Sequence, residues 1–360
     1  MDVKYSDLPE QFKGPIRRDI IHDLHELVDS GDFTLGKAVT EFENAWAAYC
    51  GVKHAIGVRS GTDALSLIFE AIGLKQGSVG VTVPNTFVAT AASIARAGMR
   101  LEFVDVADNF LMERLTFKQT VEANVVVPVD WAGDVVSMRG GQLGPAWVVR
   151  DACQAIGATL DGVSVGKLGT AAAFSLHPLK NVNVWGDGGM VTTDDDRIAE
   201  KIRLLRNHGM ADRNTYAEWG YNGRLETIQA IVGKHVLKVI EPITEKRISN
   251  AKHYDSRLRQ INGVRVPERN PRVRHVYHLY QIEADDRDNL IKYLEHAGIE
   301  AKVHYPKPLH LQPAAGGRWK TGDFPNAERQ AGRIVSLPVH QHLTEEQIEF
   351  VCDTVKNFYG

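Results

Sequence analysis

Residues 174–181 read FSLHPLKN, and a glycine-rich GDGG follows at 186–189. Lys180 lies between an apolar run and a run of glycines, which predicts a side chain that faces a cleft rather than open solvent. Upstream, the apolar run AWVVR at 146–150 predicts a buried strand that ends on Asp151, and Gln154 follows shortly after. The sequence therefore combines a carboxylate at a strand end, an internal amine at Lys180 and a hydroxyl at Ser175.

This combination predicts a site for pyridoxal phosphate. A carboxylate can pair with the pyridinium nitrogen, a lysine can form a Schiff base, and a serine can hold the phosphate. Gln154 can donate a hydrogen bond to the ring oxygen. The alternative interpretations are that Asp151 caps a helix and that Lys180 is a solvated surface residue.

Three further motifs lie near predicted strand ends or before predicted helices. SGTDAL at 60–65 follows a predicted strand, where backbone N–H groups attract phosphate and Thr62 adds a hydroxyl; read alone, it favours simple capping. PNTFVAT at 84–90 offers Phe87 for stacking on a flat ring, although a core phenylalanine is the simpler interpretation of that motif alone. GYNGRL at 220–225 reads as a cap before a long helix.

Short apolar runs alternate with helical periods, which predicts an α/β fold. Strands are expected at 79–83, 101–105, 125–129, 170–176, 190–193 and 277–282, and helices at 14–30, 63–72, 197–207, 225–259, 287–297 and from Thr344 onward. In the last helix, Thr344 and Gln347 form a predicted capping box. The change of pattern after Gly263 predicts a large domain over 1–263 and a smaller α+β domain over 264–360.

Composition restricts the class of protein. The 360 residues carry a net charge of -3 without a basic block, so nothing indicates nucleic acid or an anionic membrane as partner. The sequence contains no apolar stretch long enough to span a bilayer and no signal core near Met1, which predicts a cytoplasmic protein. The cysteines, at 50, 153 and 352, fit neither a disulfide framework nor a zinc site and are expected to be reduced thiols.

In their order along the chain, these motifs resemble the sugar aminotransferases of the DegT/DnrJ/EryC1/StrS family. The resemblance begins at FTLG (33–36) and extends over nearly the whole chain, to YPKPLH (305–310) and SLP (336–338). It implies the fold-type I architecture of pyridoxal-phosphate enzymes. In that architecture, a large domain with a mostly parallel mixed sheet flanked by helices precedes a smaller C-terminal α+β domain.

The resemblance also implies roles for individual residues. Lys180 would be the catalytic lysine that binds the cofactor covalently, and Asp151 would pair with its pyridine nitrogen. Gly61, Thr62 and Ser175 would bind the phosphate of the cofactor. Gln154 would contact its ring oxygen, and Phe87 would stack on the face of its ring. Asn222 would reach the phosphate bound by the partner subunit, so the resemblance implies a homodimer with shared active sites.

The expected activity is amination of a nucleotide-linked keto-sugar with L-glutamate as donor, for an amino sugar of a glycan or an antibiotic. The chain departs from the family at Asp130-Trp131-Ala132-Gly133, where a histidine and a tyrosine often precede the glycine, which leaves the identity of the sugar open. Amination at C3 or C4 is also open. The alternatives are an aminotransferase for a keto-cyclitol or a sugar without a nucleotide, and a non-catalytic binding or regulatory protein on the same scaffold.

Overall fold

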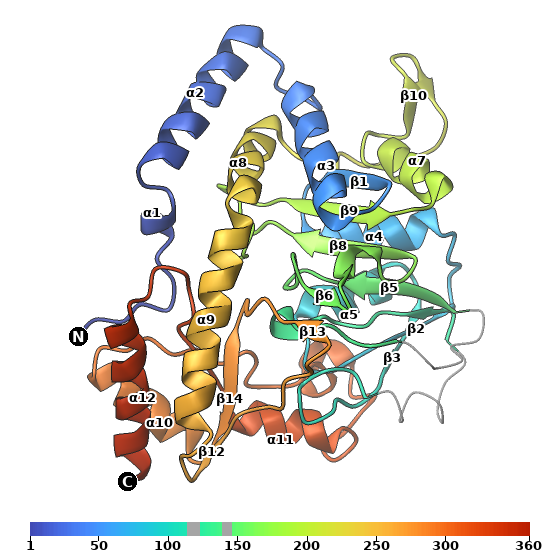
Figure 1. Cartoon of the computed structure of the whole chain (residues 1–360). Coiled ribbons are helices and arrows are strands. Elements are labelled where there is room, and N and C mark those ends of the chain that lie inside the picture. The colour runs from blue at the N-terminus through green and yellow to red at the C-terminus, as the bar shows by residue number, and fades with distance from the viewer. Residues whose placement is uncertain (114–122, 139–145) are drawn as a thin grey trace.

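The computed structural model describes residues 1–113, 123–138 and 146–360. Its centre is a seven-stranded sheet (Figure 1). In spatial order its strands are β1 (His54–Val58), β9 (Gly189–Thr193), β8 (Ala171–Ser175), β5 (Trp147–Asp151), β4 (Val125–Val126), β2 (Val79–Thr82) and β3 (Arg100–Phe103). Strand β9 runs antiparallel to β1 and β8, and the remaining pairs are parallel. The predicted mostly parallel mixed sheet is therefore confirmed.

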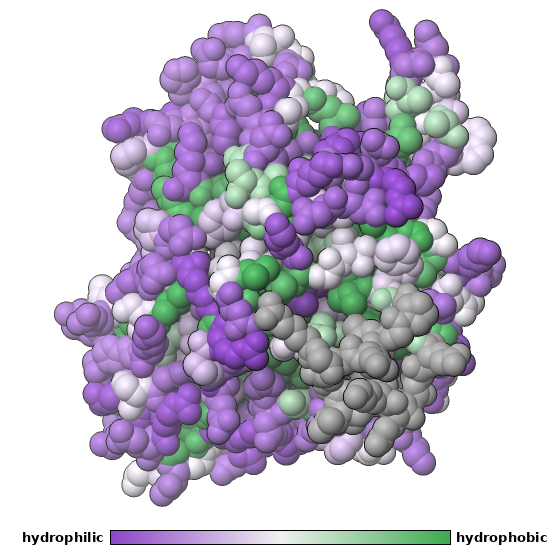
Figure 2. All heavy atoms as spheres, turned by 45° about the vertical axis from the view of Figure 1, so that its right-hand side comes forward, coloured by the Kyte–Doolittle hydropathy of each residue, from purple (hydrophilic) through white to green (hydrophobic). Residues whose placement is uncertain are grey.

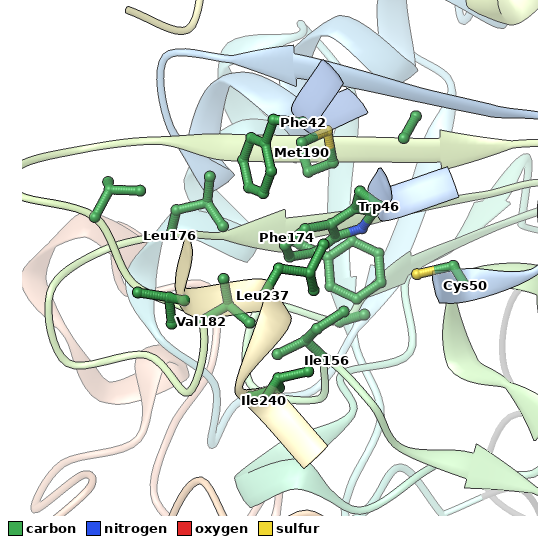
Figure 3. Packing of buried hydrophobic residues seen from close by; sticks show 14 of the residues in the cluster. Phe42, Trp46, Cys50, Ile156, Phe174, Leu176, Val182, Met190, Leu237 and Ile240 are labelled. Carbon is green, nitrogen blue, oxygen red and sulfur yellow. The ribbon is translucent and has the colours of Figure 1, made fainter. Parts of the chain in front are cut away.

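Helices cover both faces of this sheet, as the alternation of residues along β8 requires. Ala171 and Ala173 face the core shared with α4 (Gly61–Ala71), α5 (Val88–Arg96) and α7 (Asp196–Leu205). Ala172 and Phe174 face the opposite core, with α3 (Lys37–Cys50) and α8 (Thr227–Lys238). There Trp46 packs edge-to-face on Phe174 at 5.4 Å between ring centroids, next to Phe42 (Figure 3).

Two elements differ from the sequence prediction because of proline. The expected strand at 125–129 is reduced to β4, since Pro128 has no N–H to donate to the ladder. The helical pattern over 225–259 is divided into α8 and α9 (Ile240–Leu258), with Val239 between them at φ -112°. Pro242 removes the hydrogen bond that would have reached the carbonyl of residue 238, which interrupts the helix there.

The C-terminal part of the chain builds a second, antiparallel sheet. Its strands are β12 (Val264–Arg265), β14 (Tyr280–Ala284) and β15 (Ile334–Leu337), with α10 (Arg287–His296), α11 (Pro325–Arg333) and α12 (Glu345–Tyr359) around it. The capping box of Thr344 and Gln347 is confirmed. The core of this part also takes in Val3 and, from α9, Ala251, Tyr254 and Leu258. The division after residue 263 stays a prediction.

Further elements lie at the periphery. They are α1 (Leu8–Gln11), α2 (Pro15–Ser30), the hairpin of β10 (Met210–Asp212) and β11 (Thr215–Tyr216), and a small sheet of β6 (Thr159–Leu160), β7 (Val163–Ser164) and β13 (Val273–Arg274). Asp23 of α2 contacts His235 of α8 at 2.9 Å, so α2 packs on the large-sheet side of the molecule. Within the described residues, no helix combines the length and apolarity needed to cross a membrane.

Candidate active site

Asp151 and Ser175 lie at the carboxyl ends of two adjacent parallel strands, β5 and β8. In open α/β sheets this edge is where ligands bind. The Asp151 carboxylate is buried and accepts hydrogen bonds from Thr90 Oγ1 at 2.6 Å and from the backbone N–H of Cys153 at 3.2 Å. Residues 152–158 form turns rather than a helix, so the interpretation of Asp151 as a helix cap is wrong.

Lys180 lies in the loop of residues 176–188 that connects β8 to β9. Its neighbour Asn181 anchors this loop through a hydrogen bond from Nδ2 to the carbonyl of Val276 at 3.1 Å. Burial lowers the pKa of the Lys180 amine, while the nearby Cys153 and Asp151 oppose that shift. Its Nζ donates no hydrogen bond to any residue within the described ranges. A partly buried amine with a lowered pKa is a candidate nucleophile, not a solvated surface group.

The N-terminus of α4 converges on the same place. Ser60 caps the helix by accepting from the backbone N–H of Asp63 at 3.1 Å. A Cβ on Gly61 would stand 2.8 Å from Cys153 Sγ and 2.9 Å from Ser175 Cβ, so only glycine permits this approach. The start of an eleven-residue helix, with Thr62 exposed beside it and Ser175 against it, forms a cradle of donors suited to a phosphate.

Gln154 and Phe87 take positions that suit contacts with a ring. Gln154 Oε1 accepts a hydrogen bond from the backbone N–H of Ala132 at 2.6 Å, which leaves its Nε2 group free to donate. The Phe87 side chain is 53% exposed, so the interpretation of Phe87 as a core residue is wrong. Its ring lies 6.0 Å from that of Tyr305.

Asn222 lies apart from this group within one chain. Its carbonyl accepts from Arg59 Nη1 at 3.3 Å, and its side chain is exposed. Among the described residues, no hydrogen bond joins it to Asp151, Gln154 or Lys180. The structure therefore brings Gly61, Ser175, Asp151, Gln154 and Lys180 to one edge of the sheet, and leaves Asn222 on the outer surface of the chain.

Sequence reasoning missed two features behind the site. Thr86 Oγ1 lies 2.8 Å from Thr90 Oγ1, so a chain of two buried hydroxyls leads to Asp151. The available signal was the spacing of four residues between the two threonines, which places both on one side of a helix start. The second feature is a buried ion pair between Asp130 and Arg150, with Arg150 Nε 2.9 Å from Asp130 Oδ2. Part of the divergent Asp130–Gly133 segment is thus held rigidly beside Gln154.

These donors fit pyridoxal 5'-phosphate. Asp151 supplies a fixed negative charge, Lys180 supplies an amine whose neutral form is favoured by burial, and Gly61 leaves room for an anion at the helix start. The site thus offers a partner for the ring nitrogen, the aldehyde and the phosphate of that cofactor.

Comparisons with known proteins agree with this assignment. A protein of Geobacillus stearothermophilus named pleiotropic regulatory protein is 38% identical over 369 residues, covering 100% of this chain and 99% of its own. The dTDP-3-amino-3,4,6-trideoxy-alpha-D-glucose transaminase of Streptomyces venezuelae is 32% identical, covering 99% of this chain and 96% of its own. The crystal structure of DesV from S. venezuelae, in complex with a ketimine intermediate, superimposes with a TM-score of 0.96 at 32% identity, over 99% of this chain and 98% of that one.

The family resemblance is confirmed over nearly the full length. The model of the DegT/DnrJ/EryC1/StrS aminotransferase family matches residues 15–356. The chain belongs to the DegT/DnrJ/EryC1/StrS aminotransferase family and is a pyridoxal-phosphate-dependent transaminase.

Proposed function

We propose that this enzyme transfers the amino group of L-glutamate to the ketone of a nucleotide-linked sugar. The observation that supports this most is the convergence of the Lys180 amine and the buried Asp151 carboxylate on the start of α4. The S. venezuelae relative, whose printed name is that of a dTDP-amino-sugar transaminase, supports the substrate class. L-glutamate is proposed from the family resemblance.

When bound, pyridoxal phosphate supplies a carbonyl group that can accept the amino group of the donor. Its ring withdraws electrons from the reacting carbon. Lys180 Nζ would bind the cofactor covalently between turnovers. When it is released by the donor, the amine would take up and return the proton that moves during amino transfer. Burial favours the neutral form of this amine, which a base requires.

The remaining residues hold and orient the cofactor in this proposal. Asp151 would stabilise a protonated ring nitrogen, and Thr90 Oγ1 and the Cys153 N–H fix the direction of its carboxylate. Gln154 Nε2 would donate to the ring oxygen, and the exposed ring of Phe87 would cover one face of the cofactor. The phosphate would bind at Gly61, Thr62 and Ser175.

A panel of sugars tests the substrate class. The purified enzyme is loaded with pyridoxal phosphate, given L-glutamate and offered 3-keto and 4-keto sugars with and without a nucleotide, and a keto-cyclitol. We expect amination of a nucleotide-linked keto-sugar. Turnover of only the cyclitol or the free sugar would favour that alternative. Turnover of none, with no change in cofactor absorbance on adding any amino acid, would favour a non-catalytic protein.

Thr90→Val tests the support of Asp151. Valine keeps the shape of threonine but removes the hydroxyl that donates to the carboxylate at 2.6 Å. One hydrogen bond to a charged group contributes about 1.5–3 kcal/mol, so kcat/KM should fall by about tenfold or more. The pH at which the bound cofactor changes its absorbance should also shift. Thr90→Ser, which retains the hydroxyl, is the control and should keep both properties. If Thr90→Val has the same kinetics and the same cofactor spectrum as wild type, then Thr90 contributes only to packing.

We also propose a homodimer whose subunits share active sites, as the family resemblance implies. Just before Asn222 the chain exposes two large aromatic side chains, with Trp219 91% and Tyr221 52% exposed. The adjacent hairpin of β10 and β11 projects from the body of the molecule (Figure 1) and carries Tyr216, 60% exposed. Polar side chains cover most of the face drawn in Figure 2, with apolar patches between them. Exposed apolar groups gathered around one polar turn are typical of a surface that a partner covers.

Mixed dimers test this sharing. One chain carries Lys180→Ala and the other Asn222→Ala. If Asn222 acts on the partner's cofactor, one site of the mixed dimer collects both defects and the other is intact. Activity should then return to about half of wild type per dimer, from two variants that are each inactive or weak alone. Mixed dimers that form but regain no activity would show that Asn222 acts within its own subunit.

A further inference from the structure

Arg247, in the middle of α9, is a guanidinium without an acidic partner among the described residues. Its Nη1 donates to the carbonyls of Tyr277 at 3.1 Å and His278 at 3.5 Å. Its Nε is buried and makes no hydrogen bond, and Nη2 donates to no described residue. Burial lowers the pKa of Arg247 to about 10, so the group remains charged at neutral pH. A partly buried cation without a counter-ion is costly to keep.

The unused edge of this guanidinium is the one that other arginines in the chain offer to carboxylates. Nε and Nη2 together form a fork that matches two carboxylate oxygens. Arg269 shows the arrangement, with Nε and Nη2 each 3.2 Å from the two oxygens of Asp255. The same edge is presented to an aspartate by Arg59, Arg150, Arg197 and Arg272. In Arg247 no carboxylate of the described residues lies on this edge, and because its Nε is fully buried, Nη2 is the nitrogen of the edge that a ligand can reach.

A short series of contacts connects Arg247 to the catalytic lysine. Arg247 binds the carbonyls of Tyr277 and His278, and the preceding carbonyl, of Val276, binds the side chain of Asn181 next to Lys180. His278 lies near both cations. Its pKa is lowered well below the usual range, first by burial and then by Lys180, Arg247 and two histidines, so both cations lie near its ring. His278 Nδ1 is itself buried without a hydrogen bond.

We propose that Arg247 binds a carboxylate of the amino donor through its Nη2 group. The inference rests on the proposed function, because it requires that an amino acid reacts at Lys180. Every amino-acid donor carries a carboxylate beside its amino group, and glutamate carries a second one, whereas the sugar in the relative's printed name is a trideoxyglucose. A fixed cation close to the lysine suits this carboxylate, which every donor presents there. The carboxylate of a sugar such as the glucuronate in another relative's printed name is the competing ligand, and a defect confined to the sugar half of the reaction would identify it.

Glutarate provides a direct binding test, since it has the two carboxylates of glutamate and no amino group. Calorimetry on the cofactor-loaded enzyme should give weaker glutarate binding in Arg247→Met by about tenfold to a hundredfold, the range for a hydrogen bond between charged groups. Arg247→Lys keeps the charge but loses the planar guanidinium that the carbonyls of Tyr277 and His278 hold in place, and should lose most of this affinity as well. The control Arg197→Met removes the same charge from an exposed position on α7 and should bind as wild type does. Melting curves and cofactor absorbance verify that each variant is folded and loaded.

Single-turnover experiments without a sugar identify the carboxylate. If Arg247 holds the side-chain carboxylate, Arg247→Met should react more slowly with L-glutamate and unchanged with L-alanine. If it holds the α-carboxylate, both reactions should slow. Either outcome supports the proposal.

Three results would overturn it: wild-type enzyme that does not bind glutarate, equal glutarate affinity in wild type and Arg247→Met, or a defect confined to the sugar half of the reaction. Failure of the proposed function has a different signature, namely wild-type enzyme whose cofactor absorbance does not respond to any amino acid.

Discussion

Lys180→Ala should abolish turnover, with a loss of at least about a thousandfold, because the variant lacks both the covalent attachment of the cofactor and the proton-transferring amine. Burial lowers the pKa of this amine, and its Nζ is left without a hydrogen bond within the described part of the chain. Borohydride reduction of the loaded wild type, followed by peptide mapping, should place the pyridoxyl label on Lys180. The variant should retain the cofactor noncovalently and take no label.

The control for this experiment is Lys252→Ala, which removes an exposed amine from α9. This variant should be labelled and active as wild type is. A pyridoxyl label on any other lysine of the wild-type chain would contradict the assignment of Lys180 as the residue that binds the cofactor covalently.

Asp151→Asn should lower kcat by at least about a hundredfold, the usual loss when a preorganised electrostatic contact is removed from an active site. The amide can still accept from the Cys153 N–H and can donate to the Thr90 hydroxyl, so the local geometry should survive. What the amide cannot supply is the negative charge that keeps a ring nitrogen protonated. Stopped-flow absorbance with L-glutamate measures the loss, and the spectrum of the bound cofactor should change as well.

Asp105→Asn is the matched control. Asp105 is also a buried aspartate just beyond a strand, β3, but its carboxylate accepts the backbone N–H groups of Asn326 and Ala327 at the start of α11. That variant should lose some stability and keep the cofactor spectrum of wild type. If Asp151→Asn keeps near wild-type kcat, the carboxylate of Asp151 has only a structural role.

Much of the fold was predictable because local patterns and tertiary packing agree. The strand ending on Asp151 was found from five residues, and the C-terminal capping box from two side chains. The prediction was wrong where a single residue changes the backbone, as at Pro128 in the shortened β4 and at Pro242 after the break between α8 and α9. Hydrophobic periodicity continues across such prolines, so pattern alone overlooks the interruption.

The candidate site was predictable only as far as its residues lie in recognisable motifs. Gly61, Asp151, Gln154, Ser175 and Lys180 converge on one sheet edge, as the order of the motifs suggested. The roles of Thr90 and Arg247 could not be assigned from the sequence, because the residues that each of them contacts lie far away along the chain. A threonine near a helix start and an arginine within an amphipathic helix have ordinary local explanations. The distance from Thr90 to Asp151, and the lack of an acidic partner for Arg247 among the described residues, distinguish them.

The antiparallel pairing of β8 with β9 has a consequence for the cost of each catalytic cycle. Ser175 pairs with Gly189, and Leu176 N–H donates to the Gly188 carbonyl at 2.8 Å, so the loop carrying Lys180 leaves and re-enters the sheet at the same point. A loop tied at both ends explores fewer conformations than a free segment of the same length. The conformational entropy of ordering the backbone that carries the amine is then lost once, when the chain folds, and not again when a substrate arrives. The barrier to amino transfer therefore contains little entropy of ordering from the backbone of this loop.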